Sequence, residues 1–259
     1  MASPGRPLAL VTGASGGIGA DLARELAKDG HDLVLSARTV PAMEALADEL
    51  RAHGANSTVI AADLAKPRAA AELASCLEDR GLQIDVLIAN AGLGGVGRFD
   101  QMDPQRISDM LMINVLALTE LTRILVPGMV ARGRGKVLLV ASTASFQPGP
   151  RMAVYFATKS YVLSLGEALT YELRGTGVTV TTLCPGATAT NFFKAAGATE
   201  NLMPAMSAPE VARVGYRALK TGRRVVITGI MNRILALGGR YGPHWLTLPA
   251  TAAALMSRR

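Results

Sequence analysis

The sequence predicts an α/β fold built on one doubly wound parallel sheet of about seven strands, with helices on both faces. Short apolar runs alternate with longer amphipathic stretches along most of the 259 residues. The apolar runs are continuous rather than alternating, as in strands that are buried on both faces. No linker, repeat or low-complexity segment interrupts the pattern. We therefore expect a single domain over residues 1–259.

The expected strands are short apolar runs bounded by polar or glycine residues. They are Leu8–Val11, Asp32–Ala37, Ser57–Ala62, Ile84–Ala89, Val137–Ala141, Val178–Cys184 and Val225–Thr228. Between them, apolar residues recur at about 3.6-residue spacing, and several of these segments open with proline, which is typical of a first helical turn. The expected helices are Ile18–Asp29, Pro41–Ala52, Pro67–Asp79, Pro104–Ala131, Met152–Leu173 and Pro209–Lys220. In such a sheet, ligands bind beyond the carboxyl ends of the strands.

Composition excludes several classes of protein. The chain is 49% hydrophobic and 18% charged, which argues against disorder and against a small disulfide-stapled scaffold. Cys76 and Cys184 stand in unrelated contexts and the three histidines show no ligand spacing, so we expect no metal site and no disulfide. The longest apolar runs fall far short of the ~20 residues that cross a bilayer, and no signal peptide is evident. A reducing, cytoplasmic location is expected.

The net charge of +7 is concentrated near the C-terminus. Residues 1–200 hold 18 basic and 19 acidic side chains, whereas residues 201–259 hold nine basic and one acidic. Aromatic residues make up 4% of the chain, too few for a nucleic-acid surface. An arm near 230–259 combines the basic excess with apolar residues, which suits peripheral contact with an anionic membrane or the mouth of a pocket for an acidic, lipid-like substrate. The alternative is an arm packed on its own domain or on a partner subunit.

A glycine-rich turn follows the first strand, in the segment Thr12-Gly13-Ala14-Ser15-Gly16-Gly17-Ile18-Gly19. Gly13 permits a tight turn, Gly17 lets the backbone approach a pyrophosphate at the positive end of a helix, and Gly19 allows close packing of helix on strand. With a strand before it and a helix after it, this pattern indicates a Rossmann-type dinucleotide site. A glycine-rich turn without a ligand is the alternative.

The end of the second strand bears on the choice of dinucleotide. A carboxylate at this point binds the ribose hydroxyls of NAD, but here Ala37 stands in its place and Arg38 follows. A guanidinium suits a 2′-phosphate, so NADP is favoured. A solvated loop arginine is the alternative. Asp32 begins the strand, at the wrong end to substitute.

Two segments have the form Tyr-x-x-x-Lys, which places both side chains on one helix face: Tyr155 to Lys159 and Tyr216 to Lys220. A nearby ammonium stabilises a phenolate and so lowers the pKa of a tyrosine. The first pair follows a strand end that carries a hydroxyl, Ser142, thirteen residues before the tyrosine. The first pair is therefore the candidate for chemistry, and we expect the second to lie on an exposed amphipathic helix.

Asn114 is a further candidate, because it interrupts an apolar stripe of the expected helix Pro104–Ala131. A buried amide that lacks hydrogen bonds costs about 1–3 kcal/mol. The alternative to a functional role is a core asparagine whose hydrogen bonds are satisfied.

Taken together, these motifs resemble those of the short-chain dehydrogenase/reductase family over residues 8 to about 190. The matching segments are Thr12-Gly13-x3-Gly17-x-Gly19, Asp63, Asn90-Ala91-Gly92, Asn114, Ser142, Tyr155-x3-Lys159 and Pro185-Gly186. The resemblance implies that Tyr155 is the general acid in reduction and the base in oxidation. It implies that Ser142 holds the substrate oxygen and that Asn114 positions a water in a proton relay. Lys159 would bind the nicotinamide ribose and lower the tyrosine pKa.

The same resemblance implies a cofactor channel. In it, Asp63 contacts the adenine, Asn90 and Gly92 line the channel, and Thr188 approaches the carboxamide. The full expected cofactor set is Gly13, Ser15, Gly17, Ile18, Gly19, Arg38, Asp63, Asn90, Gly92, Tyr155, Lys159, Pro185, Gly186 and Thr188. Lowering a phenol pKa of about 10 by about 3 units takes roughly 4 kcal/mol, which the lysine and an oxidised nicotinamide together could supply.

The segment near 187–207 is expected to form a mobile lid on an apolar pocket, because Phe192, Phe193, Leu202, Met203 and Met206 lie among small residues. Ordinary packing of a surface helix is the alternative. The glycine-rich stretch 93–97 is expected to form a pliable rim of that pocket.

These features lead to one functional hypothesis and one alternative. The first is an NADP(H)-dependent carbonyl reductase or alcohol dehydrogenase that acts on a hydrophobic small molecule. The alternative is a catalytically silent NADP(H)-sensing regulatory or scaffold protein. The resemblance also implies a homodimer or homotetramer, formed through the helices that contain Asn114 and Tyr155.

Overall fold

The computed structural model describes residues 5–197 and 205–256, and its centre is a parallel sheet of seven strands. The strands are β1 (Leu8–Thr12), β2 (Asp32–Ala37), β3 (Ser57–Ala61), β4 (Val86–Ala89), β5 (Gly135–Val140), β6 (Val178–Cys184) and β9 (Val225–Ile227). Their spatial order is β3-β2-β1-β4-β5-β6-β9, and every neighbouring pair is parallel. The predicted fold class is confirmed, with small shifts at the strand ends.

The order of the sheet creates a crevice. The chain leaves β3 at one edge and returns to β4 beside β1, so the connections that follow β1 and β4 run in opposite directions across the sheet. A crevice therefore opens at the carboxyl ends of these two strands, which is where ligands bind in folds of this class.

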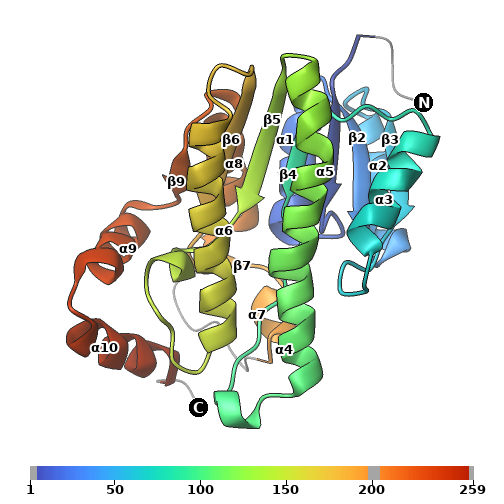
Figure 1. The fold of residues 1–259 in the computed structure, drawn as a ribbon. Coiled ribbons are helices and arrows are strands. Elements are labelled where there is room, and N and C mark those ends of the chain that lie inside the picture. The colour runs from blue at the N-terminus through green and yellow to red at the C-terminus, as the bar shows by residue number, and fades with distance from the viewer. Residues whose placement is uncertain (1–4, 198–204, 257–259) are drawn as a thin grey trace.

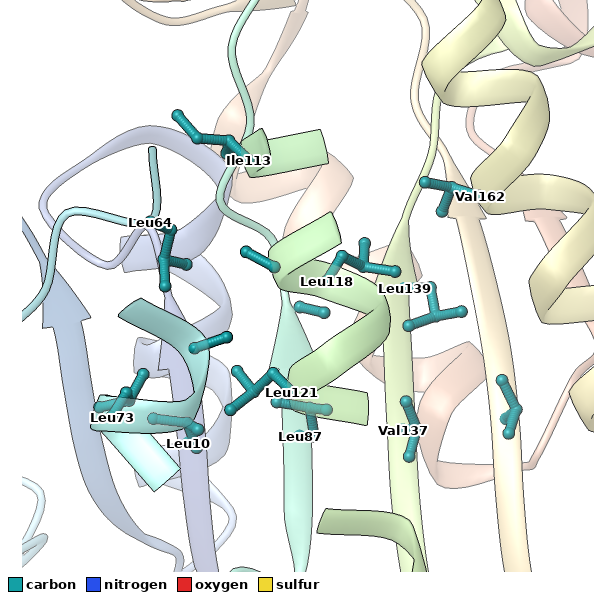
Figure 2. Packing of buried hydrophobic residues seen from close by; sticks show 14 of the residues in the cluster. Leu10, Leu64, Leu73, Leu87, Ile113, Leu118, Leu121, Val137, Leu139 and Val162 are labelled. Carbon is teal, nitrogen blue, oxygen red and sulfur yellow. The ribbon is translucent and has the colours of Figure 1, made fainter. Parts of the chain in front are cut away.

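Two helical layers cover the sheet (Figure 1). One layer holds α1 (Gly17–Lys28), α2 (Val40–Arg51) and α8 (Ala208–Lys220), and the other holds α3 (Ala69–Asp79), α4 (Pro104–Leu111), α5 (Leu118–Ala131) and α6 (Ala153–Glu172). Successive strand residues pack into opposite layers: Leu8 and Leu10 join the core under α3 and α5, whereas Ala9 and Val11 join the core under α1 and α8. Figure 2 shows Leu10, Leu87, Leu121 and Val137 within the first of these cores. Burial on both faces thus explains why the strands consist of uninterrupted apolar residues.

The expected helix Pro104–Ala131 is continuous but not uniform. A π-helical segment, Met112–Ala117, joins α4 to α5, and Asn114 lies within it. Residues 104–131 form the one helix in the described part of the chain that is long and apolar enough to cross a membrane, although 44% of its apolar window is buried inside the protein. Its apolar composition is accounted for by packing on the sheet through residues such as Met110 and Leu121.

The C-terminal third contains elements that the sequence pattern did not predict. A two-stranded sheet pairs β7 (Thr188–Ala189) with β8 (Met206–Ser207), and a short helix, α7 (Phe192–Ala195), lies between them. The expected arm folds into two helices, α9 (Ile230–Tyr241) and α10 (His244–Met256), and Figure 1 shows both on the far side of α6 from α4. Two residues of the predicted lid, Leu202 and Met203, lie outside the described residues.

Candidate active site

A cavity of about 1010 Å³ lies at the carboxyl ends of the strands. It is lined by the turns after β1, β2, β3, β4, β5 and β6 and by residues of α7, α9 and α10. Among the residues predicted for the site, those on its wall are Gly13, Ser15, Gly17, Ile18, Arg38, Asp63, Asn90, Gly92, Ser142, Tyr155, Lys159, Pro185, Gly186 and Thr188. Gly19 and Asn114 do not line the cavity, but each contacts a residue that does. Gly19 packs against Gly13, and Asn114 is hydrogen-bonded to Leu93.

The glycine-rich turn is shaped by close contacts with β4. Gly13 has a positive φ of 67°, and a Cβ there would lie 2.8 Å from the side-chain nitrogen of Asn90. That Asn90 nitrogen donates to the carbonyl of Thr12 at 2.9 Å and so ties the turn to the end of β4. A Cβ on Gly19 would collide with the carbonyl of Gly13, which confirms the close helix–strand packing expected there.

The N-terminus of α1 is open to a ligand. The helix begins at Gly17, and its N-cap residue, Gly16, has no side chain to satisfy the first N–H groups. Gly17 has a φ of 56°, and a Cβ there would lie 2.9 Å from the methyl carbon of Thr190. The segment after β7 therefore lies directly over the turn. Free N–H groups at the positive end of a helix suit a phosphate.

Arg38 follows β2 at the rim of the cavity, where its side chain is exposed. Within the described chain, no hydrogen bond or ion pair engages its guanidinium, so it is available to an anionic ligand. Asp32 lies at the opposite end of β2, is fully buried, and forms an ion pair with Arg6 at 3.1 Å. The carboxylate of Asp32 is thus committed to structure, as its position in the strand predicts.

The remaining predicted cofactor residues occupy the floor between the strand ends. Asp63 accepts a hydrogen bond from the N–H of Ala65 at 3.2 Å, and Thr188 donates to the carbonyl of Gly186 at 3.0 Å. Gly92 leaves room between two polar groups: a Cβ there would lie 3.5 Å from both Asn114 Oδ1 and Lys159 Nζ.

Tyr155 projects from the first turns of α6 toward Ser142, which follows β5. The Ser142 hydroxyl accepts from the N–H of Ala144 at 3.1 Å and donates to the carbonyl of Pro185. Burial of the phenol raises the pKa of Tyr155 to about 12, and the nearby Ser142 hydroxyl opposes that rise. The tyrosine is therefore a neutral hydroxyl at pH 7, with a serine hydroxyl close by on the cavity wall.

Lys159 lies one turn further along α6 and is 4% exposed. Its ammonium donates to the carbonyl of Val140 at 2.8 Å and lies 5.9 Å from the centroid of the Tyr155 ring. Burial lowers the pKa of Lys159 to about 8. The expectation that this lysine lowers the tyrosine pKa is not met in the protein by itself, because the ammonium points to Val140 and desolvation of the phenol dominates.

Asn114 is fully buried and fully hydrogen-bonded. Its amide oxygen accepts from the N–H of Leu93 at 2.8 Å, and its amide nitrogen donates to the carbonyl of Leu93 and to the hydroxyl of Thr158. These bonds clamp the strand end after β4 to the helix that carries Lys159. The amide has the satisfied surroundings of a core asparagine, and its role in a water relay stays a prediction.

The second Tyr-x-x-x-Lys pair has a structural role. The helix α8 is amphipathic, but Tyr216 is not exposed as expected: it is 6% exposed because α8 packs against α1. Its hydroxyl donates to the carboxylate of Asp29 just beyond α1, and Lys220 forms an ion pair with the same carboxylate at 2.8 Å. Asp29 lies at the amino-terminal end of β2, remote from the cavity.

The half of the cavity beyond Tyr155 is apolar. The ring of Phe192, from α7, lies 5.4 Å from that of Tyr155, and Met152, Phe156 and Leu255 form an apolar cluster against Tyr155. Phe192 also rests on the backbone of the 93–97 rim, where a Cβ on Gly94 would lie 2.6 Å from its ring. The rim and α7 are joined by Arg106, which donates to the carbonyls of Gly94 and Ala195.

The helices α9 and α10 form part of the cavity wall, so the arm near 230–259 packs on its own domain, which was one of the expected alternatives, but the sequence did not predict which of its residues line the cavity. On α10 the residues facing the cavity recur at helical spacing, and they are Leu246, Thr247, Ala250, Thr251, Ala254 and Leu255. On α9, Asn232 packs against Gly186, and Gly239 packs against Gln147 beside the turn after β5. Distance along the chain concealed these contacts, and no motif in the arm signals them.

No group of three or more His, Cys, Asp or Glu side chains that could hold a metal ion occurs within residues 5–197 and 205–256. Both cysteines are free thiols, and burial raises the pKa of Cys184 to about 12. The half-buried hydroxyls of Tyr155 and Ser142 on the cavity wall are suited to proton transfer with a bound ligand.

A model of the short chain dehydrogenase family matches residues 7–201 of this chain. The match ends before α9 and α10, so the apolar wall formed by these two helices lies outside the matched region.

Solved structures resemble the chain over nearly its whole length. A short-chain dehydrogenase from Sphingobium yanoikuyae in complex with NADPH is 35% identical, with 90% of this chain and 92% of that chain covered and a TM-score of 0.82. A bulky-bulky ketone specific alcohol dehydrogenase from Comamonas testosteroni is 32% identical, with 98% and 94% covered and a TM-score of 0.78. A short-chain dehydrogenase/reductase from Burkholderia phymatum in complex with NAD is 25% identical, with 90% and 92% covered and a TM-score of 0.81.

The buried ammonium of Lys159 is expected to lower the free energy of unfolding of the protein. Because its pKa of about 8 in the folded chain lies below the unfolded value of about 10.4, the charge disfavours folding by about 3 kcal/mol below pH 8. The Val140 hydrogen bond lost on substitution is worth about 1 kcal/mol. Lys159→Met is therefore expected to raise the free energy of unfolding at pH 7 by about 1–2 kcal/mol, measured by urea denaturation.

The pH dependence of this gain in stability gives a second check. The gain from Lys159→Met should shrink as the pH rises from 8 toward 10.4, since the parent protein then loses its buried charge. Lys66→Met, at an exposed lysine, is the control and should change stability little at any pH. A Lys159→Met protein that is less stable than the parent at pH 7 would contradict the account.

Proposed function

The chain belongs to the short-chain dehydrogenase/reductase family of oxidoreductases, and from this premise we propose that it is an NADP(H)-dependent carbonyl reductase or alcohol dehydrogenase for a hydrophobic substrate. The observation that carries the proposal is the placement of Tyr155 and Ser142 on one wall of the cavity, beside the buried Lys159. A sensor protein has no need of a desolvated phenol and a buried, uncompensated cation at the same point.

Tyr155, Ser142 and Lys159 each have a different role in the proposed carbonyl reduction. Bound NADPH supplies a hydride for the carbonyl carbon. Tyr155, kept protonated by its raised pKa, donates its proton to the carbonyl oxygen, and Ser142 hydrogen-bonds the same oxygen. The Lys159 ammonium lies beside Gly92 on the cavity wall, where it would supply a positive charge and could hold a ribose hydroxyl of the cofactor. In oxidation the tyrosine would first have to lose its proton.

The preference for NADP(H) rests on Arg38. Its unpartnered guanidinium at the end of β2 fits a 2′-phosphate, and no carboxylate stands there to repel one. The open N-terminus of α1 fits the pyrophosphate. The NADPH complex of the Sphingobium relative supports this choice, whereas the NAD complex of the Burkholderia relative shows that similar chains take either cofactor.

The hydrophobic substrate is inferred from the wall beyond Tyr155. Side chains that face this part of the cavity are aromatic, aliphatic or uncharged polar, with Phe192 and Leu255 nearest to the tyrosine. Apolar surface of this kind binds by removing apolar ligand area from water, at about 25 cal/mol per Å². The ketone specificity named for the Comamonas relative supports a carbonyl substrate with apolar substituents.

We also propose a homo-oligomer formed through the outer faces of α4–α5 and α6, which lie side by side (Figure 1). Exposed apolar side chains gather there: Leu111, Leu116, Ile124, Tyr161 and Tyr171. The hydroxyls of Thr119 and Tyr161 lie 3.0 Å apart and join the two helices into one surface. Two copies that meet on this surface would bury these groups from water. The cytoplasmic location stays a prediction.

The two tyrosine motifs give a matched test of the catalytic assignment. Tyr155→Phe is expected to lower kcat for NADPH-dependent reduction of a ketone panel by about 10²–10⁴-fold, because the general acid is lost, while NADPH binding is retained. Tyr216→Phe removes a hydrogen bond remote from the cavity, so kcat should be unchanged and stability should fall by about 1 kcal/mol. NADPH binding by the parent with no carbonyl reduced across the panel would favour the silent sensor instead.

The assignment of Arg38 predicts a change in cofactor preference. Arg38→Asp is expected to raise the Kd for NADPH about 10- to 100-fold, because a charge-assisted hydrogen bond becomes a repulsion, and to leave the Kd for NADH nearly unchanged. Titration of cofactor fluorescence measures both. Arg80→Asp, a matched change at an exposed arginine off the cavity, should alter neither constant. An equal loss of both cofactors in Arg38→Asp would argue against 2′-phosphate recognition.

The proposed interface predicts the effect of a charge on its surface. Ile124→Glu is expected to convert the oligomer to a smaller species in sedimentation velocity at micromolar concentration, since a carboxylate would be buried without a partner. Phe99→Glu, at an exposed aromatic residue off this face, is the control. A parent protein that sediments as a monomer would contradict the proposal.

A further inference from the structure

The outer surface of α9 and α10 is apolar although it faces solvent. Of the fourteen large apolar side chains that are exposed in the described chain, eight lie on these two helices. They are Ile230, Met231, Ile234, Leu235, Leu237, Tyr241, Trp245 and Leu246. We call this set the hairpin surface. A contiguous apolar surface of this kind on a soluble domain marks a site of interaction.

The helix α9 is apolar on both of its sides. Asn232, Ala236 and Gly239 face inward, where Ala236 and Gly239 are buried. Ile230, Ile234, Leu237 and Tyr241 recur at helical spacing on the opposite side, and all of them are exposed. A surface helix of a globular protein normally carries polar residues there. The outward stripe thus contributes nothing to the core of this chain.

Both charged residues of α9 are arginines. Arg233 and Arg240 each lie one residue before a member of the outward stripe, and Arg240 forms an ion pair with Glu167 of α6 at 3.8 Å. The last acidic residue of the whole sequence is Glu210, so no Asp or Glu lies on α9 or α10. The helix α10 carries no Asp, Glu, Lys or Arg. A helix that carries apolar side chains and arginines but no carboxylate suits the surface of an anionic bilayer.

The substrate cavity opens at this surface. Ile234, Leu235 and Leu246 belong to the hairpin surface and also line the cavity, so apolar side chains connect the two. Trp245 and Tyr241, which are 76% and 77% exposed, flank this opening with rings that prefer the interface between lipid and water.

We propose that the hairpin surface docks on an anionic lipid bilayer and admits a membrane-dissolved, apolar carbonyl compound directly into the cavity. A second copy of this chain is the less suitable occupant. A twofold contact pairs a surface with itself, so it would bury Arg233 in an interface to which α9 and α10 bring no carboxylate, and it would close the cavity mouth. The delivery step rests on the proposed reductase activity, whereas docking does not.

Trp245 is the single tryptophan of the chain, so its fluorescence reports on the hairpin surface alone. With the full chain, phosphatidylcholine vesicles that contain phosphatidylglycerol are expected to shift its emission to shorter wavelength, and vesicles of phosphatidylcholine alone should not. Sedimentation with the same vesicles should show binding more than about tenfold tighter to the anionic ones, and high salt should remove most of that difference. An unshifted emission, or equal recovery with both vesicles, would overturn the proposal.

A pair of variants separates docking from folding and from catalysis. Trp245→Glu places a carboxylate on the hairpin surface and is expected to weaken vesicle binding more than about tenfold, whereas Phe99→Glu makes the same change on an exposed aromatic residue elsewhere and should bind as the parent does. Neither residue lines the cavity. Equal vesicle binding by the two variants would contradict docking through the hairpin. If Trp245→Glu without vesicles has half the mass of the parent protein, the hairpin surface is an interface between copies, and the proposal is overturned.

Direct entry of a membrane-dissolved substrate into the cavity is tested with two ketones and NADPH. For a short, water-soluble ketone, Trp245→Glu should match the parent in kcat and KM. For a long-chain ketone dissolved in anionic vesicles, its rate should fall about tenfold or more. Equal rates in the second case would refute delivery. If neither protein reduces any ketone, the proposed activity fails, while the fluorescence and sedimentation results still decide docking.

Discussion

The parallel alignment of seven strands is the constraint on which the site depends. Because all the strands run one way, their carboxyl ends meet at a single edge, and the turns after β1, β2, β4, β5 and β6 deliver backbone and side chains to one cavity. The return of the chain from β3 to β4 beside β1 opens the crevice between them. The hydrogen bonds from Asn90 to the turn after β1 hold this crevice in shape.

Polar groups that the fold buries at this edge are satisfied in two different ways. Asn114 lies in the π-helical segment, and its side-chain amide hydrogen-bonds to the backbone of Leu93 and to the hydroxyl of Thr158. These bonds fix the loop after β4 relative to α6. Lys159 has a backbone carbonyl as acceptor and no carboxylate beside it, and its pKa is lowered accordingly. A buried amide with full hydrogen bonding stabilises the fold, whereas a buried cation without a counter-charge destabilises it through the cost of desolvation.

The apolar half of the cavity is assembled from elements far apart in the chain. The short helix α7 contributes Phe192 from one side, held to the rim by Arg106, and α10 contributes Leu255 from the other. Figure 1 shows that α6, which carries Tyr155, stands between α4 and the C-terminal helices. The Tyr155 side chain therefore lies among apolar residues that come from elements far apart in the chain, and α9 and α10 also form the outer surface.

Local sequence patterns were enough to predict the fold class, the approximate strand positions and the residues at the strand ends. Burial on both faces leaves a continuous apolar signature, and a tight turn needs glycine at positions such as Gly13 and Gly19. The spacing of Tyr155, Lys159 and Ser142 likewise followed from local helix and strand geometry. Three features became visible only in the folded chain: the Lys159 ammonium turns to Val140, Tyr216 is buried against α1, and α9 and α10 line the cavity. These outcomes depend on contacts between elements distant in sequence and on the desolvation that such contacts cause, and no local pattern encodes either.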